Sequence, residues 1–181
     1  MSEEPESFNF SPIAVANYFV SKGIDEGSPI GLLKVVKLVY FAHGACLAYF
    51  GKSLFSEQVE AWNYGPVIPS VYHTFKIYGK QLIGKPANEL TMDKKFKFRL
   101  NTPRLSNNDL EKLNAEFDDG TVMNMLDVVW RVYGKYSGVQ LVDITHKKDS
   151  PWETEFRDDA HHIPIPNDKI EKYFQKEGFR R

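Results

Sequence analysis

Residues 30–50 read IGLLKVVKLVYFAHGACLAYF, a long run of mainly apolar side chains. Placed on a helix, these side chains occupy most of the circumference, which is typical of a central helix surrounded by others. We expect Lys34 and Lys37 to lie on the one edge of this helix that meets water. Its strongly apolar part, residues 35–50, is interrupted by polar residues and is too short to span a bilayer.

Capping signals place further helices around this one. Ser11-Pro12 and Ser28-Pro29 each put a hydroxyl cap before a proline at the first helical position, and Ser150-Pro151-Trp152-Glu153 has the pattern of a capping box. Glycines follow four periodic segments, as helix ends require, at positions 23, 51, 79 and 134. The predicted helices cover residues 12–22, 30–50, 67–78, 107–117, 121–133, 138–146, 151–157 and 168–177.

Two segments favour strands. Residues 96–100, FKFRL, alternate apolar and polar side chains with the period of a half-buried strand, and residues 58–62 could pair with them. Residues 80–95 contain Gly84 and Pro86 and are expected to form a surface loop. The sequence therefore predicts a mainly α fold, a single compact helical domain around a central buried helix, with a small β-hairpin or two-stranded sheet.

The length of 181 residues fits one domain, which we expect to cover residues 11–177 between a disordered tail at 1–10 and a short tail at 178–181. The formal net charge of −1 gives no general basic excess for nucleic acid, although basic residues cluster at 94–99. Cys46 is the one cysteine, so neither an internal disulfide nor a cysteine-based zinc site can form. With an acidic N-terminus that lacks a signal-peptide pattern, these features favour a cytoplasmic protein without a membrane segment.

Residues that could carry chemistry do not form a known catalytic or metal-binding motif. The five histidines lack metal-ligand spacing, so we expect neither metal nor cofactor; they are His43, His73, His146, His161 and His162. Cys46 and His43 lie within the apolar helix and are expected to be buried and inert. The acidic pairs at 118–119 and 158–159 resemble solvated helix ends. We therefore predict no catalytic residue and no enzymatic activity.

Two local clusters stand out instead. The first is Trp62-Asn63-Tyr64-Gly65-Pro66-Val67, which joins two aromatic residues to a rigid turn before a helix. Aromatic side chains beside such a turn can anchor an interface, although we expect Trp62 to pack in the core; for Tyr64, exposure and burial both remain open. The second cluster is residues 141–152, where one helix ends and another begins. There we expect Trp152 to wedge into the core and His146 to lie at a helix C-terminus.

Taken together, the clusters resemble the Panacea antitoxin domain, which also occurs in SocA-like antitoxins and in phage-associated GepA proteins. The similarity runs from about residue 11 to 175, and its most specific part is A-W-x-Y-G-P-V at 61–67 followed by T-H-x-x-x-S-P-W at 145–152. The remaining matching segments are Ala16–Phe19, Leu33–Gly44, Tyr49–Phe55, Val71-Tyr72, Tyr78-Gly79 and Leu141. Residues 80–135 match only in general character.

The resemblance implies protein binding. Panacea-type domains neutralise toxins encoded beside them, so it implies a cognate protein toxin as the partner and, in one variant, a protease to which the toxin is presented. The residues that we expect to contact the partner are Trp62, Tyr64, Pro66, Tyr72, His73, His146 and Trp152.

Three alternatives remain open. The protein could bind operator DNA and regulate its own operon, although its neutral charge argues against this and no helix-turn-helix signature stands out. It could be a solitary phage or prophage protein that binds a host factor. It could also be a hydrolase using His146 with Asp143 or Asp149, since Asp143 and His146 share one helix face. The sequence does not indicate the oligomeric state.

Overall fold

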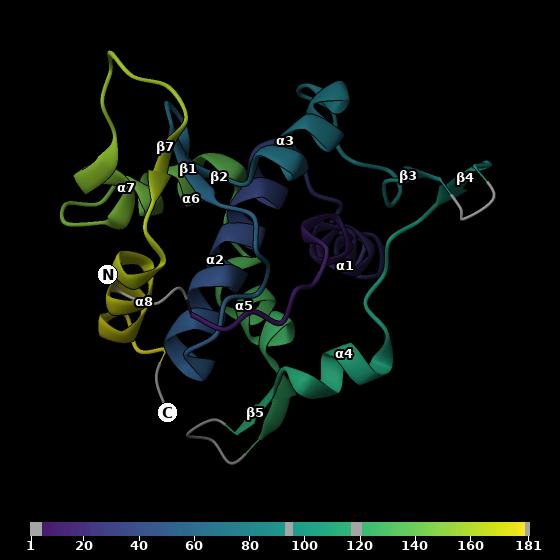
Figure 1. The fold of residues 1–181 in the computed structure, drawn as a ribbon, viewed down its shortest axis with the longest axis horizontal. Helices are drawn as coiled ribbons and strands as arrows, with labels where there is room; N and C mark the ends of the chain where they lie inside the picture. Colours follow the sequence, from purple (N-terminus) through teal and green to yellow (C-terminus); the bar gives the residue numbers. More distant parts are fainter. Residues whose placement is uncertain (1–4, 93–95, 117–120, 180–181) are drawn as a thin grey trace.

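The computed structural model describes residues 5–92, 96–116 and 121–179. Helix α2 (Leu32–Phe50) lies at its centre, with other helices packed around it (Figure 1). The helices that contact α2 are α1 (Pro12–Asp25), α3 (Pro69–Phe75), α5 (Met125–Tyr133), α6 (Gly138–Thr145) and α8 (Asn167–Lys176). The predicted mainly α fold around a central helix is confirmed.

Burial along α2 is almost continuous from Val35 to Ala48. His43 and Cys46 are buried as predicted, and His43 Nε2 lies 2.8 Å from Asn167 Oδ1 at the start of α8. Gly44 permits the close approach of α8, because a Cβ there would lie 2.3 Å from the Phe174 ring. The expectation that this apolar segment is too short to span a bilayer does not hold for the whole helix: α2 is long and apolar enough by length and composition, although 78% of its most apolar window is buried within the fold.

The expectation for Lys37 was wrong. Lys37 is only 1% exposed, whereas Lys34 is partly exposed and reaches the carbonyl of Gly134. Helical periodicity alone could not separate these two positions, because the side that looked polar is covered by the chain at residues 65–66.

The remaining helices follow the predicted positions with shifted ends. The predicted helix at 67–78 begins at Pro69 and tightens into the 3-10 turn η1 (Lys76–Tyr78). The helix predicted at 107–117 is shorter: α4 (Asn107–Lys112) is followed by the strand β5 (Asn114–Glu116). The helix predicted at 121–133 starts later, because its first residues form the strand β6 (Val122–Asn124), which pairs with β5. α7 (Pro151–Glu155) begins at its predicted cap, Ser150. Asp118 and Asp119 lie outside the described residues.

Of the four glycines predicted to end helices, Gly51 ends α2 in the left-handed conformation, at φ 65°. Gly79 follows η1, also at positive φ. Gly23 lies inside α1 instead, and Gly134 ends α5 at φ −61°, a right-handed conformation.

The strand pairing differs from the prediction. β1 (Val59–Trp62) pairs with β2 (Gly65–Val67) and with β7 (Ile163–Ile165) to give the sheet order β2-β1-β7. β4 (Phe98–Asn101) pairs with β3 (Glu89–Met92), so the expected pairing of 58–62 with 96–100 was wrong. Periodicity identifies a strand but not its partner, and the nearer segment forms the hairpin in both cases.

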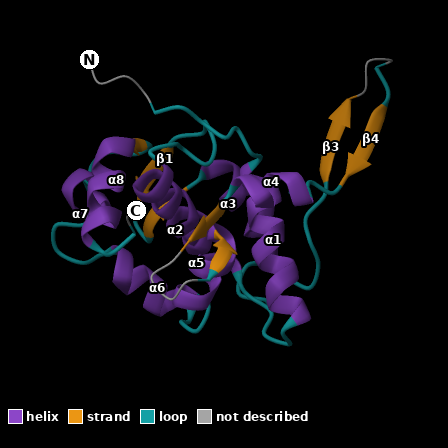
Figure 2. Ribbon diagram, turned by 90° about the horizontal axis from the view of Figure 1, so that it is seen from below, coloured by secondary structure: helices purple, strands orange, loops and turns teal. Residues whose placement is uncertain are grey.

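The hairpin of β3 and β4 was also expected to be a loop followed by a half-buried strand. It stands away from the helices (Figure 2), and all four residues of β4 are exposed. By contrast, the segment expected to be a disordered tail packs in part: Phe8 and Phe10 donate backbone hydrogen bonds to the carbonyls of Ser53 and Leu54. The packed chain thus begins before residue 11.

Candidate functional site

The turn between β1 and β2 brings the first aromatic cluster to the surface. Trp62 pairs with Gly65 in the sheet register, so Asn63 and Tyr64 form the two-residue turn, and Tyr64 is 69% exposed. Gly65 has φ 93°, a conformation that residues with a Cβ rarely adopt. Space is restricted as well, because a Cβ at Gly65 would lie 2.5 Å from Thr145 Oγ1 and 2.8 Å from Lys37 Nζ.

Lys37 reaches the same turn from α2. Its Nζ donates a hydrogen bond of 2.9 Å to the carbonyl of Pro66. This acceptor is neutral and burial removes water from the ammonium, so desolvation lowers the pKa of Lys37 to about 7. A buried lysine at this position ties the central helix to the aromatic turn.

The second cluster, at residues 141–152, is bonded to the first one through Trp152. The hydroxyl of Ser150 donates to the carbonyl of Thr145 at 2.8 Å, and the same hydroxyl caps α7. Trp152 is buried as predicted, and its Nε1 donates a 2.7 Å hydrogen bond to the carbonyl of Trp62. The two motifs, some eighty residues apart in the chain, are therefore bonded to each other.

His146 lies flat against Trp152, with ring centroids 3.7 Å apart and an interplanar angle of 3°. Burial, followed by the nearby charge of Lys37, lowers the pKa of His146, whereas Asp143 acts in the opposite direction. Its Nε2 is buried and has no hydrogen-bond partner within the described part of the chain. A neutral ring that stacks on tryptophan fits a structural role.

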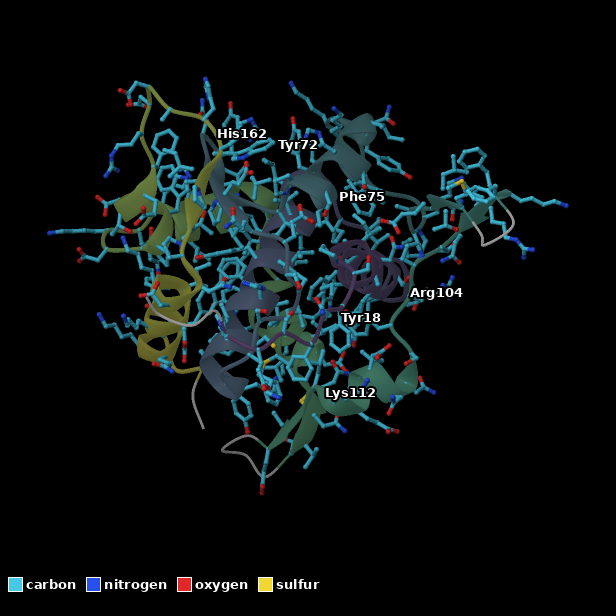
Figure 3. All side chains as sticks on the ribbon, viewed as in Figure 1. Tyr18, Tyr72, Phe75, Arg104, Lys112 and His162 are labelled. Atoms are coloured by element: carbon cyan, nitrogen blue, oxygen red, sulfur yellow. The ribbon has the colours of Figure 1, made fainter. Side chains whose placement is uncertain are left out.

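We call the bonded group of Lys37, Pro66, Trp62 and Trp152, together with the stacked His146 ring, the junction. A cavity of about 360 Å³ opens beside the junction. Trp62, Tyr64 and Tyr72 line it from the sheet and α3, Leu33 from α2, and His162 from the segment before β7. Figure 3 shows Tyr72 and His162 close together at the same end of the molecule. The walls are largely apolar and aromatic, which is typical of a pocket that accepts a side chain or a small ligand.

Polar groups hold one side of this cavity in place. Glu60 Oε2 accepts a 2.7 Å hydrogen bond from Trp62 Nε1 and lies 2.8 Å from His162 Nδ1. His162 adopts φ 57°, so its backbone is held in an uncommon conformation. The Trp62 ring is thus fixed in orientation at the mouth of the cavity, with His162 edge-on at 5.9 Å between ring centroids.

Among the described residues, those that line the cavity include no serine, threonine or cysteine. Cys46 lies on α2 outside this lining, and burial raises the pKa of its thiol, which disfavours the reactive thiolate. Over residues 5–92, 96–116 and 121–179, no group of three or more His, Cys, Asp or Glu side chains is arranged to hold a metal ion. The arrangement is suited to binding through shape and aromatic contact.

The structure divides the seven residues predicted to contact a partner. Trp62, Tyr64 and Tyr72 line the cavity, and exposed His73 lies next to them with its ring 6.1 Å from that of Trp62. The other three belong to the junction between the two clusters, where Pro66 and Trp152 are buried and His146 is partly buried. Sequence reasoning missed Leu33 and Lys37 as cavity residues and gave His162 no role, since only the fold brings their segments together.

Comparison with known proteins now adds to this geometry. The family model described as "Antitoxin SocA-like, Panacea domain" matches residues 35–153, which include both motifs and the junction between them. The chain belongs to the SocA-like Panacea-domain family. A curated relative, Antitoxin SocA from Caulobacter vibrioides (strain NA1000 / CB15N), is 29% identical over 153 residues, which cover 84% of this chain and 73% of the relative. No solved structure matches the chain.

Proposed function

We propose that this Panacea-domain protein is the antitoxin of a toxin–antitoxin pair and neutralises its toxin by binding it directly, in the cytoplasm. Its family and the name of its Caulobacter relative support the antitoxin role. The observation that carries the binding mechanism is the apolar cavity with Tyr64, 69% exposed, beside it. Tyrosine and tryptophan at the mouth of a pocket are common anchors of protein interfaces.

Neutralisation by binding differs from enzymatic inactivation in its stoichiometry. A binding antitoxin occludes a fixed number of toxin molecules, whereas an enzyme would inactivate many. The described lining of the cavity offers apolar and aromatic side chains for contact with a protein partner. Occlusion also leaves the toxin intact, while delivery to a protease would shorten its lifetime.

The experiment is co-expression with the gene encoded next to this one. We expect that gene to arrest growth when expressed alone, and this protein to restore growth and co-purify with an intact product at a fixed ratio. A neighbouring gene that is harmless alone, or toxic but not rescued, overturns the proposal. A product that disappears on co-expression, and persists when cellular proteases are removed, indicates the adaptor variant.

Tyr64→Ala tests the site. Tyr64 is exposed, so its truncation is expected to change the free energy of unfolding by less than about 0.5 kcal/mol, while the Kd for the toxin rises about tenfold or more. Ile77→Ala is the matched control, because Ile77 is an apolar residue 80% exposed on η1 and does not line the cavity. Equal affinities of the two variants would remove the cavity from the interface.

A further inference from the structure

The least exposed residue of the cavity lining is a lysine. Lys37 is 1% exposed, whereas Tyr64 in the same lining is 69% exposed. A buried charge is costly unless an opposite charge lies beside it. The ammonium of Lys37 therefore requires a partner within the fold or within the cavity.

The acceptor that the described fold gives this ammonium is neutral. Lys37 Nζ donates a 2.9 Å hydrogen bond to the carbonyl of Pro66, which uses one of the three N–H donors of an ammonium. Among the described residues, those that line the cavity include no aspartate or glutamate. Glu60 lies outside the lining, and its Oε2 is already bonded to Trp62 and His162. The lining thus contains a basic group whose charge no described residue of the lining balances.

The walls of the cavity and its lysine together define the chemistry of an occupant. A volume of about 360 Å³ lies in the range of ligand pockets, and the walls include Leu33, Trp62 and Tyr72, against which the methylene groups of a bound side chain can pack. A carboxylate accepts charge-assisted hydrogen bonds from an ammonium, and these are stronger than the bond to a neutral carbonyl. An apolar stem that ends in a carboxylate therefore complements both the walls and Lys37.

We propose that the toxin inserts the side chain of a glutamate or aspartate into the cavity, where its carboxylate pairs with the ammonium of Lys37. This inference rests on the proposed antitoxin function and names the group of the toxin that the cavity recognises. Lys37 keeps its hydrogen bond to Pro66 and offers its remaining N–H donors to the carboxylate. A toxin with an apolar side chain at the same position would leave the buried ammonium unpaired, so Lys37 determines specificity.

Pairing with a carboxylate changes the protonation of Lys37. In the free protein burial lowers its pKa to about 7, so at pH 8 only about a tenth of the molecules carry the charge. A carboxylate in contact favours the charged form, so the complex takes up about one proton at pH 8. An apolar occupant would exclude water, disfavour the charged form further and take up no proton.

Other titratable groups contribute little at this pH, because an ordinary histidine is neutral and an ordinary tyrosine is protonated at pH 8. The groups of these two kinds near Lys37 or in the cavity lining are His146, His161, His162, Tyr64 and Tyr72. Proton uptake at pH 8 therefore reports on Lys37.

The test is calorimetric titration of this protein with the purified product of the neighbouring gene, at pH 8, in two buffers of different ionisation enthalpy. The difference in heat gives the number of protons taken up. Lys37→Met removes the titrating group, and Lys34→Met is the matched control, because Lys34 lies on the same helix, is partly exposed and does not line the cavity. We expect uptake of about 0.9 proton by the unmodified protein and by Lys34→Met, and of about none by Lys37→Met. The Kd should rise about thirtyfold or more in Lys37→Met and less than about threefold in Lys34→Met.

The outcomes separate the two proposals. If the unmodified protein neither binds nor rescues, the antitoxin function is overturned, and this inference with it. If it binds without taking up a proton, or if both variants bind as it does, only the pairing of Lys37 with a carboxylate is overturned. The pH profile of the unmodified protein decides even if Lys37→Met does not fold. Uptake that falls from pH 8 to pH 6 supports Lys37, because the free lysine is then already charged, whereas uptake that grows toward pH 6 belongs to a histidine and contradicts the inference.

Discussion

The junction around Lys37 and the hairpin of β3 and β4 use aromatic and aliphatic side chains in opposite ways. At the junction, Trp152 is 9% exposed and bonded to the carbonyl of Trp62. On the hairpin, Phe98 is 70% exposed, and Asn17 holds the base of the hairpin through the carbonyls of Ala87 and Pro103. The junction thus buries its large side chains within the fold, whereas the hairpin presents apolar side chains to solvent.

This contrast indicates that several residues of the two family motifs have a structural role. A-W-x-Y-G-P-V and T-H-x-x-x-S-P-W resemble a binding signature, yet Pro66, His146 and Trp152 mainly fasten the central helix to the sheet and to α7. Five residues of the first motif line the cavity, namely Ala61, Trp62, Asn63, Tyr64 and Val67, whereas none of the second motif does. The first motif therefore contributes both to the internal packing and to the cavity.

The largest expected effect compares one large aromatic residue from each region. Trp152→Ala removes a buried indole and leaves the Trp62 carbonyl without its donor, so we expect the free energy of unfolding to fall by about 3–5 kcal/mol. Phe98→Ala on the hairpin is expected to change it by less than about 0.5 kcal/mol. Urea unfolding measures both, and similar losses for the two variants would contradict the division between scaffold and surface.

A second comparison separates backbone strain from crowding at the junction. Gly65→Ala combines a positive φ with contacts to Thr145 and Lys37 that are closer than a Cβ tolerates. We therefore expect the free energy of unfolding to fall by about 3 kcal/mol. Gly27→Ala is the control, since Gly27 has φ 69° and no heavy atom within 4 Å of an added Cβ. The free energy of unfolding of the Gly27→Ala variant is expected to fall by about 1 kcal/mol. Equal losses would show that the junction is not tightly packed at Gly65.

The smallest of these effects is the change of stability with pH that the titration of Lys37 causes. Burial holds its pKa at about 7 in the folded protein, below the value of 10.5 for an exposed lysine. Between these two values the unfolded chain binds more protons than the folded one, so stability increases with pH. We expect Lys37 to contribute a gain of about 2 kcal/mol from pH 7 to pH 9.

Lys37→Met keeps the side-chain length and removes the titration. Chemical denaturation of both proteins at a series of pH values isolates the lysine, because every other group is shared. The free energy of unfolding of the original protein should rise by about 2 kcal/mol relative to that of the variant as pH rises from 7 to 9. A difference independent of pH would show that Lys37 keeps its ordinary pKa and is accessible to water.

The sequence was sufficient for features that local physics controls. The apolar circumference of residues 30–50 predicted the central helix, and the caps at Ser11 and Ser150 predicted where α1 and α7 begin. The burial of His43, Cys46 and Trp152 followed from their apolar surroundings. The family resemblance was also recognisable in the sequence alone, because the two aromatic motifs carry it.

Features that depend on distant segments were not predictable in the same way. Lys37 was placed in water, because its periodicity cannot reveal that Gly65 and Pro66 cover it. The alternation at residues 96–100 suggested a half-buried strand, whereas its apolar side faces solvent on an isolated hairpin. Alternation reports that one face is apolar; it does not report what covers that face.

Hydrogen–deuterium exchange of this protein with and without the purified product of the neighbouring gene tests the central claim most directly. The claim is that the toxin binds across the mouth of the cavity, while the hydrogen bonds from Lys37 to Pro66 and from Trp152 to Trp62 serve as scaffold. We predict slower exchange on binding at residues 62–64, with the buried part of α2 unchanged. Protection that leaves these segments untouched and appears elsewhere on the surface would contradict it.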